Sequence, residues 1–124
     1  MKYVAVEGMT IVYTAGALSA IVTATLGQAS SNVNIDGKGV YIDGLELTAS
    51  SWQIGTYTVP VGAPVTGNFE SSARKVKADG EYVLLEGDTA EFDVRATDPN
   101  TQTTQTFTIT ATVQSAGQTS VKAE

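Results

Sequence analysis

The sequence of 124 residues contains neither cysteine nor histidine. No disulfide can stabilise the fold, and the cysteine content gives no information about the redox compartment. The lack of histidine removes the most common metal ligand and the most common general base. Because the usual nucleophile–base pairs need one of these residues, and because the acidic residues are spread through predicted turns, we expect no enzymatic activity and no cofactor.

Charged residues are also scarce, at 16% of the chain, and the formal net charge is −6. The 13 acidic residues outnumber the 7 basic ones, which argues against nucleic-acid binding through phosphate contacts. Residues 9–34 carry no charge but are too rich in Thr, Ser, Gly and Ala for a membrane span. The N-terminus lacks the basic and apolar regions of a signal peptide. The abundance of Thr, Ser, Val, Ala and Gly favours β structure, and the length fits one domain over residues 1–124.

One motif occurs in two separate copies, which align with each other without gaps. Residues 30–47 read "SSNVNIDGKGVYIDGLEL" and residues 72–90 read "SARKVKADGEYVLLEGDTA". In both copies, alternating residues flank an Asp-Gly pair, which is the strongest short-range signal for a two-residue hairpin turn. The pattern predicts β-hairpins over residues 32–43 and 75–86.

A third copy is divided between the two ends of the chain. The closing "TSVKAE" aligns with "RKVKAD" at residues 74–79, and the opening "KYVAVEGMT" aligns with "EYVLLEGDT" at residues 81–89. The first strand of the third hairpin therefore closes the chain, and the second strand opens it. We expect a closed ring of three units rather than an open stack, with Met1 near Glu124 and the terminal strands paired antiparallel.

The alternation of residue types assigns the faces of the hairpins. One face is predicted to meet at a narrow axis, and its twelve residues are Val33, Ile35, Val40, Ile42, Val76, Ala78, Val83, Leu85, Val121, Ala123, Val4 and Val6. The connections are predicted to be rich in β structure. Residues 88–119 are expected to form a longer hairpin around an Asp-Pro-Asn turn, and residues 15–22 could hold a short helical turn.

The repeats resemble the PAAR and PAAR-like family, the spike-tip proteins of contractile injection machines. Units of that family have a consensus close to V-x-I-N-G-K-x-x-A-x-x-G-D, and the matching segments are "VNIDGKGVYIDG", "VKADGEYVLLEGDTA" and "YVAVEG". The closing "AGQTSVKAE" is similar to the C-terminal ending of the family. The resemblance implies an all-β fold, a compact pseudo-threefold cone of three β-hairpins whose third hairpin is formed by the N- and C-terminal strands, with β-rich excursions forming the apex.

The same resemblance implies a function. A tip of this kind caps and sharpens the trimeric β-helical spike of a type VI secretion system, an extracellular injection particle or a phage tail, with one tip per trimer. It helps to pierce the target membrane, which it contacts transiently, and effector or cargo proteins could be further partners. It is assembled in the cytoplasm onto the machine or virion and delivered extracellularly without a signal peptide. The alternative is a β-sandwich or barrel module for binding or adhesion in a fibre or cell-surface protein.

The chain departs from the family pattern in two respects. The Pro-Ala-Ala-Arg tetrapeptide is missing, and the histidines and cysteine that hold an apical zinc in many family members are absent. Asp and Glu alone are poor ligands for a tetrahedral zinc site. We therefore expect an apex without zinc that is closed by side-chain packing and hydrogen bonds.

The repeats also define the candidate site residues. Glu7, Asp43 and Glu86 occupy equivalent positions before a glycine, and a closed ring would bring them to equivalent places. They could bind a partner or a cation, or each could accept backbone N–H bonds where its strand ends. The remaining positions are predicted to serve the turns of the repeats: Asp36, Gly37, Gly44, Asp79, Gly80, Gly87 and Gly8.

Aromatic residues in the connections allow two interpretations. Trp52, Tyr57 and Phe69 could form a ligand platform, or they could anchor the second connection by packing. Packing is the interpretation we favour, and we expect the same of Phe92 and Phe107 in the third connection.

Overall fold

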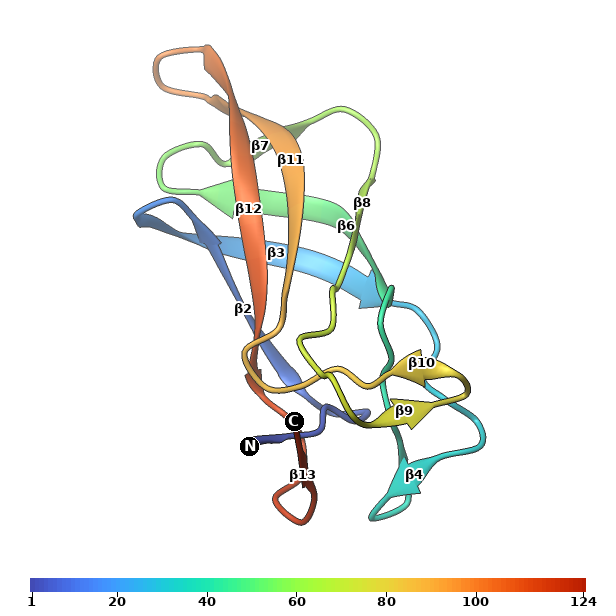
Figure 1. Cartoon of the computed structure of the whole chain (residues 1–124). Helices are drawn as coiled ribbons and strands as arrows, with labels where there is room; N and C mark the ends of the chain where they lie inside the picture. Colours follow the sequence, from blue (N-terminus) through green and yellow to red (C-terminus); the bar gives the residue numbers. More distant parts are fainter.

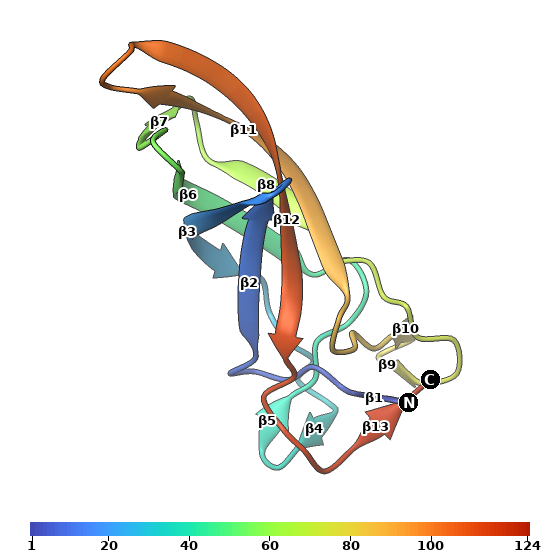
Figure 2. The same cartoon turned by 90° about the vertical axis from the view of Figure 1, so that its left-hand side faces the viewer.

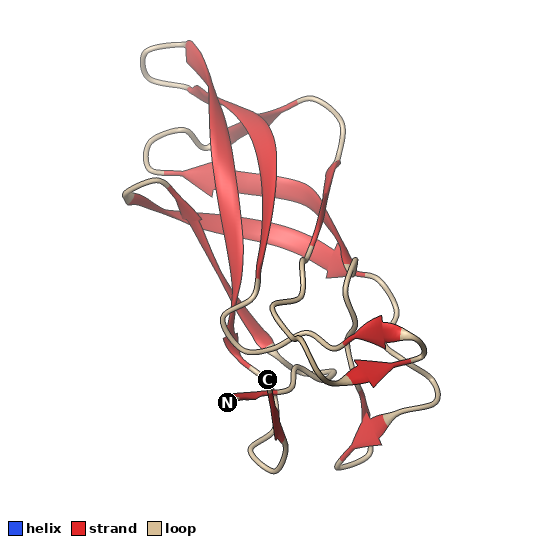
Figure 3. Cartoon of the chain, viewed as in Figure 1, coloured by secondary structure: helices blue, strands red, loops and turns tan.

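The computed structural model describes residues 1–124 and contains thirteen strands and no helix (Figure 3). Seven strands form one antiparallel sheet in the order β7-β11-β12-β2-β3-β6-β8, and this sheet curls into a half-barrel (Figure 1). The strands are β2 (Thr10–Ala15), β3 (Leu18–Leu26), β6 (Glu46–Ile54), β7 (Val59–Val61), β8 (Val65–Asn68), β11 (Thr89–Asp98) and β12 (Thr103–Ser115). The expected all-β fold class is confirmed.

Strands β11 and β12 form the longest hairpin of the sheet. They pair over ten residues, from Thr89 opposite Thr112 to Asp98 opposite Thr103. Both strands alternate between buried apolar and more exposed polar residues, as expected for a sheet with one covered face. The longer hairpin predicted in residues 88–119 is therefore confirmed.

The helical turn considered for residues 15–22 is wrong. Ala15 ends β2 and Leu18 begins β3, and the two residues are paired across a tight turn in which Gly16 has a φ of 61°. Glycine adopts this conformation at little cost, so the segment favours a hairpin over a helix. Pairing of β2 with β12 and of β3 with β6 then extends both strands.

Six short strands form three two-stranded sheets at the other end of the molecule (Figures 1 and 2). They are β4 (Asn34–Ile35) with β5 (Lys38–Gly39), β9 (Lys77–Ala78) with β10 (Glu81–Tyr82), and β1 (Lys2–Tyr3) with β13 (Lys122–Ala123). We call residues 1–8, 30–44, 71–87 and 116–124 the hairpin end. The predicted antiparallel pairing of the terminal strands is confirmed, since Lys2 lies opposite Ala123 and Tyr3 opposite Lys122.

Two hydrophobic clusters lie on opposite faces of the hairpin segments. The main core holds 18 buried residues, including Trp52, Phe69 and Ile109 of the half-barrel region, and also Ala5, Tyr41 and Leu84 from the three hairpin units. A second cluster of eight buried residues lies within the hairpin end: Val4, Val6, Val40, Ala73, Ala78, Val83, Leu85 and Ala123. Alternate residues of one segment thus serve both clusters, which attaches the hairpin end to the sheet.

The predicted inner face is correct for nine of its twelve residues. Seven belong to the second cluster, and Ile35 and Ile42 pack against it. Val33, Val76 and Val121 are instead exposed, at 37%, 41% and 42% of their surface. The bridges between units involve the residues that follow the second strand of each hairpin, as in Val6 opposite Val40. The residue that leads into the first strand therefore stays outside the converging segments.

Leu84 offers a test of the attachment between the two parts. Its side chain is fully buried in the main core, although its backbone belongs to a hairpin unit. We expect Leu84→Ala to lower the free energy of unfolding by about 3 kcal/mol, because the substitution leaves a cavity in a packed core. Urea denaturation followed by Trp52 fluorescence measures this.

The matched control for this prediction is Leu18→Ala, because Leu18 is 47% exposed. The control should change the free energy of unfolding by less than about 0.5 kcal/mol. Equal effects of the two substitutions would contradict the role assigned to Leu84.

Candidate functional site

The three hairpin units are joined by a closed cycle of backbone hydrogen bonds. The Ala5 amide donates to the Leu84 carbonyl over 2.8 Å, and the Leu84 amide donates to the Tyr41 carbonyl over 2.9 Å. The Tyr41 amide donates back to the Ala5 carbonyl over 3.0 Å. These residues hold the same position in the three copies of the repeat. Each unit therefore binds both of the others through one residue.

Neighbouring positions repeat this cycle. The bridges that surround it are Val4 with Leu85, Ile42 with Val83, and Val6 with Val40. A further set of backbone bonds joins the acid near the end of each unit to the hairpin of another unit. The amides of Glu7, Asp43 and Glu86 donate to the carbonyls of Gly39, Tyr82 and Tyr3 over 3.0, 2.8 and 2.9 Å, respectively. Every equivalent contact is made three times.

Side chains at the hairpin turns make a second cycle, in which the acid of one turn holds the segment that leads into another hairpin. Asp79 accepts hydrogen bonds from Ser30 Oγ at 2.5 Å and from Asn32 Nδ2 at 2.9 Å. Asp36 accepts one from Ser120 Oγ at 2.9 Å. We call these contacts the turn clasps.

The third clasp lies where the chain ends meet. Glu124 aligns with Asp36 and Asp79 in the repeat, and its side chain lies 3.0 Å from the Lys75 ammonium. The backbone carbonyl of Glu124 also accepts bonds from the amides of Arg74 and Lys75, at 2.9 and 3.0 Å. Because exposed ion pairs contribute little, the backbone bonds are the more important part of this clasp.

Sequence reasoning missed the turn clasps although it placed their acids in turns. Asp36 and Asp79 have φ angles of 54° and 52°, and the glycine after each also has a positive φ, so both pairs form tight turns. The available signal was the residue before the first valine of each unit. That residue is Asn32, Lys75 or Ser120, and each is a hydrogen-bond donor.

The acids before the glycines each bond to a backbone amide. Glu7 accepts from Gly39 N at 2.8 Å, Asp43 from Ser71 N at 2.7 Å, and Glu86 from Ala116 N at 3.3 Å. The glycines that follow, Gly8, Gly44 and Gly87, have φ angles of 93°, 84° and 94°. The structure contains no group of three or more acidic side chains arranged to hold a metal ion. These contacts favour the structural interpretation of the three acids, and their contact with a partner stays a prediction.

Hydrogen bonds also set the protonation of two acids. The donors Ser30 and Asn32 lower the pKa of Asp79 below its usual value. Asp98 lies at the β11–β12 turn, where bonds from Thr56 Oγ1 and the Asn100 amide, each 2.8 Å long, lower the pKa of its carboxyl group. Both carboxylates therefore stay charged and serve as acceptors at neutral pH.

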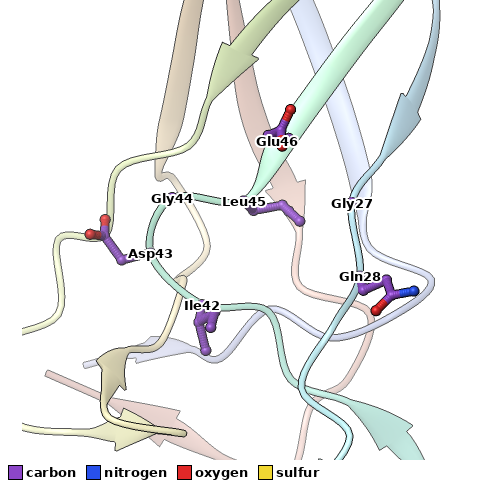
Figure 4. Close-up of a pocket in the computed structure, with 7 residues that line it drawn as sticks. All are labelled: Gly27, Gln28, Ile42, Asp43, Gly44, Leu45 and Glu46. Atoms are coloured by element: carbon purple, nitrogen blue, oxygen red, sulfur yellow. The ribbon is translucent and has the colours of Figure 1, made fainter.

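The hollow between the sheet and the hairpin end does not gather functional groups around one point. It is lined by residues 27–28 and 42–46, between β3 and β6 and the hairpin end (Figure 4). Figure 4 shows the side chains of Gln28 and Asp43 on opposite sides of this hollow and pointing away from each other. The Asp43 carboxylate is directed to the Ser71 amide instead. The hollow therefore lacks the convergent polar groups of a typical small-molecule site.

The aromatic residues of the connections pack against other parts of the chain. Trp52 and Phe69 are buried in the main core, and Trp52 Nε1 donates to the Arg95 carbonyl over 2.8 Å. Tyr57 lies edge-on to Phe107 with 5.1 Å between ring centroids. Phe92 is also buried in the main core. These contacts favour packing over an exposed ligand platform.

Comparison of the chain with models of known protein families, with curated proteins and with solved structures finds no match. The structure also has no helix that is long and apolar enough to cross a membrane.

The Asp79 clasp predicts a specific pH dependence of stability. Because the pKa of Asp79 is lower in the folded chain, its charged form stabilises the fold above the unfolded-state pKa of about 4. This stabilisation is lost as the pH falls through the folded-state pKa. The unfolding temperature of wild type should exceed that of Asp79→Asn most at pH 7, and the difference should shrink below about pH 4.

Glu81 lies in the same hairpin and is exposed, so Glu81→Gln is the matched control. Its unfolding temperature should follow that of wild type from pH 7 to pH 2. A difference between wild type and Asp79→Asn that does not change with pH would contradict the role of the clasp.

Closure by hydrogen bonds also predicts insensitivity to metal chelators. The unfolding temperature should be the same with and without EDTA, because the two cycles of contacts at the hairpin end need no ion. Elemental analysis of the purified protein provides the second measurement. Stoichiometric zinc, or a fall in unfolding temperature on chelation, would show that a metal contributes to closure.

Proposed function

We propose that this protein is the structural tip of a contractile injection machine, where it caps and sharpens a trimeric β-helical spike. The observation that supports this most strongly is the closed cycle of bonds among Ala5, Leu84 and Tyr41, one from each hairpin unit. With the equivalent bridges and turn clasps, the cycle supports a pseudo-threefold axis through the hairpin end.

An internal threefold axis matches the symmetry of a trimeric partner. A single chain normally presents one copy of each surface patch, so it can satisfy only one subunit of a trimer. Three equivalent units allow one chain to offer a similar patch to each subunit. Such a monomer can close the end of a spike with one copy per trimer.

The remaining architecture suits a part that transmits force. Two layers of contacts, backbone and side chain, link each unit of the hairpin end to the others. Alternate residues of those units pack into the main core, which attaches the units to the sheet. In the proposed assembly, the hairpin end rests on the spike and the half-barrel forms the apex. The β11–β12 hairpin then leads, since it extends farthest from the hairpin end (Figure 2).

The second candidate is a binding or adhesion module of a fibre or cell-surface protein. The observation that favours it is the curled antiparallel sheet, whose strand β12 reads "TTQTFTITATVQS" and carries a row of threonines on its more exposed face. A binding module of this kind gives no reason for the terminal strands to complete a third hairpin. We therefore rank it second.

Stoichiometry separates the two candidates. The protein should form a complex with the purified trimeric spike protein of the contractile machine from the same genome, at one copy per trimer. Size-exclusion chromatography with light scattering measures the mass of the complex. An unrelated trimeric β-helical fibre serves as the control and should not bind. Three copies per trimer, or no complex with the spike, would contradict the proposed function.

A further inference from the structure

The exposed valines of the hairpin end occupy one repeat position. Val33, Val76 and Val121 each lead into the first strand of their unit, and their exposures differ by only a few per cent. Single exposed apolar residues are common on protein surfaces. Here, however, the same residue type is exposed at all three equivalent positions, whereas the other nine residues of the predicted inner face are buried in the second cluster or pack against it.

A free backbone edge adjoins each of these valines. The amides of Val40, Val83 and Val4 donate to the carbonyls of Val33, Val76 and Val121, so these are hydrogen-bonded pairs. In antiparallel sheets the next pair along is not hydrogen-bonded, and its groups point outward. The residues that follow the three valines, Asn34, Lys77 and Lys122, are therefore left with outward N–H and C=O groups, and none of them has a hydrogen-bond partner elsewhere in the chain.

The opposite edges of the hairpins are already occupied. Gly39, Tyr82 and Tyr3 lie across from the free residues, and their carbonyls accept the bonds that close the ring of units. Each hairpin thus has one edge used inside the molecule and one edge open to solvent. An open edge can pair with a strand from another chain, and a short edge limits that pairing to a partner of matching geometry.

Charge distinguishes this part of the molecule as well. The hairpin end holds seven acidic and six basic residues and is therefore nearly neutral, whereas the rest of the chain has six acidic residues and one basic residue. The basic residues of the hairpin end are Lys2, Lys38, Arg74, Lys75, Lys77 and Lys122. Lys77 and Lys122 lie on the open edges, with their ammonium groups 4.8 Å from the ring centres of Tyr82 and Tyr3. A partner surface with carboxylates would complement them.

We propose that the three open edges, with Val33, Val76 and Val121 beside them, form the docking surface for the trimeric spike. This inference rests on the proposed function and names the surface that performs it. Each spike subunit offers a free strand end to one edge, an apolar side chain to the adjoining valine, and carboxylates to the lysines. Backbone pairing sets the orientation, and the valines supply apolar contact area.

The first test replaces the apolar contacts. Val76→Asp/Val121→Asp should weaken binding of the purified spike trimer by about 30-fold or more in isothermal titration calorimetry, because charges would be buried at the interface. The matched control is Val12→Asp on β2, which is 40% exposed and lies outside the hairpin end. The control should bind like wild type. Circular dichroism and unfolding temperature report whether each variant keeps its fold.

A second variant tests the same surface independently, in case the first variant does not fold. Lys77→Glu/Lys122→Glu changes only exposed side chains, and it should slow association with the spike and reverse the salt dependence of the association rate. Failure of wild type to bind the spike would overturn the proposed function itself. Normal one-to-trimer binding by wild type and by both double variants would leave that function standing and overturn this docking surface. Equal weakening by Val12→Asp would also overturn it.

Discussion

The fold depends on one set of three hydrogen bonds, from the amides of Ala5, Leu84 and Tyr41 to carbonyls of the same three residues. Each bond joins two different hairpin units, so the set holds segments from the beginning, middle and later part of the chain. Because each of the three residues donates through its amide and accepts through its carbonyl, none of them has an unpaired backbone polar group. The side chains of these residues reach the main core, while their neighbours fill the second cluster. The junction therefore couples the hairpin end to the half-barrel.

Repetition accounts for the parts that the sequence predicts well. The Asp-Gly pairs, alternating valines and divided third copy led to three hairpins, to antiparallel terminal strands and to most of the inner face. These features depend on local turn chemistry and on the two-residue period of strands, which one sequence displays directly. The assembly of the connections into one seven-stranded sheet depends on long-range pairing, such as β3 with β6, and no local pattern specifies that order.

The candidate site, like the fold, could be predicted from the sequence only in part. Equivalent acids at positions 7, 43 and 86 were visible from the alignment of the repeats, but the backbone amides that they bind come from distant parts of the chain. The turn clasps were missed because Asp79 meets Ser30 and Asn32 only after the units close into a ring. The exposed valines were wrongly predicted to be part of the inner cluster, because alternation does not show where a strand enters the ring of units. The sequence showed which residue types occupy equivalent positions of the repeats, whereas the contacts of these residues depend on the fold.

Hydrogen exchange at the central junction tests the account most directly. Amides within a few residues of a chain end normally exchange fast because the ends fray. The closed cycle predicts that the Ala5 amide is protected as strongly as those of Tyr41 and Leu84, with a free energy of exchange close to that of global unfolding. Exchange of Ala5 as fast as that of a frayed terminus, while Tyr41 and Leu84 stay protected, would contradict the closed cycle that joins the three units.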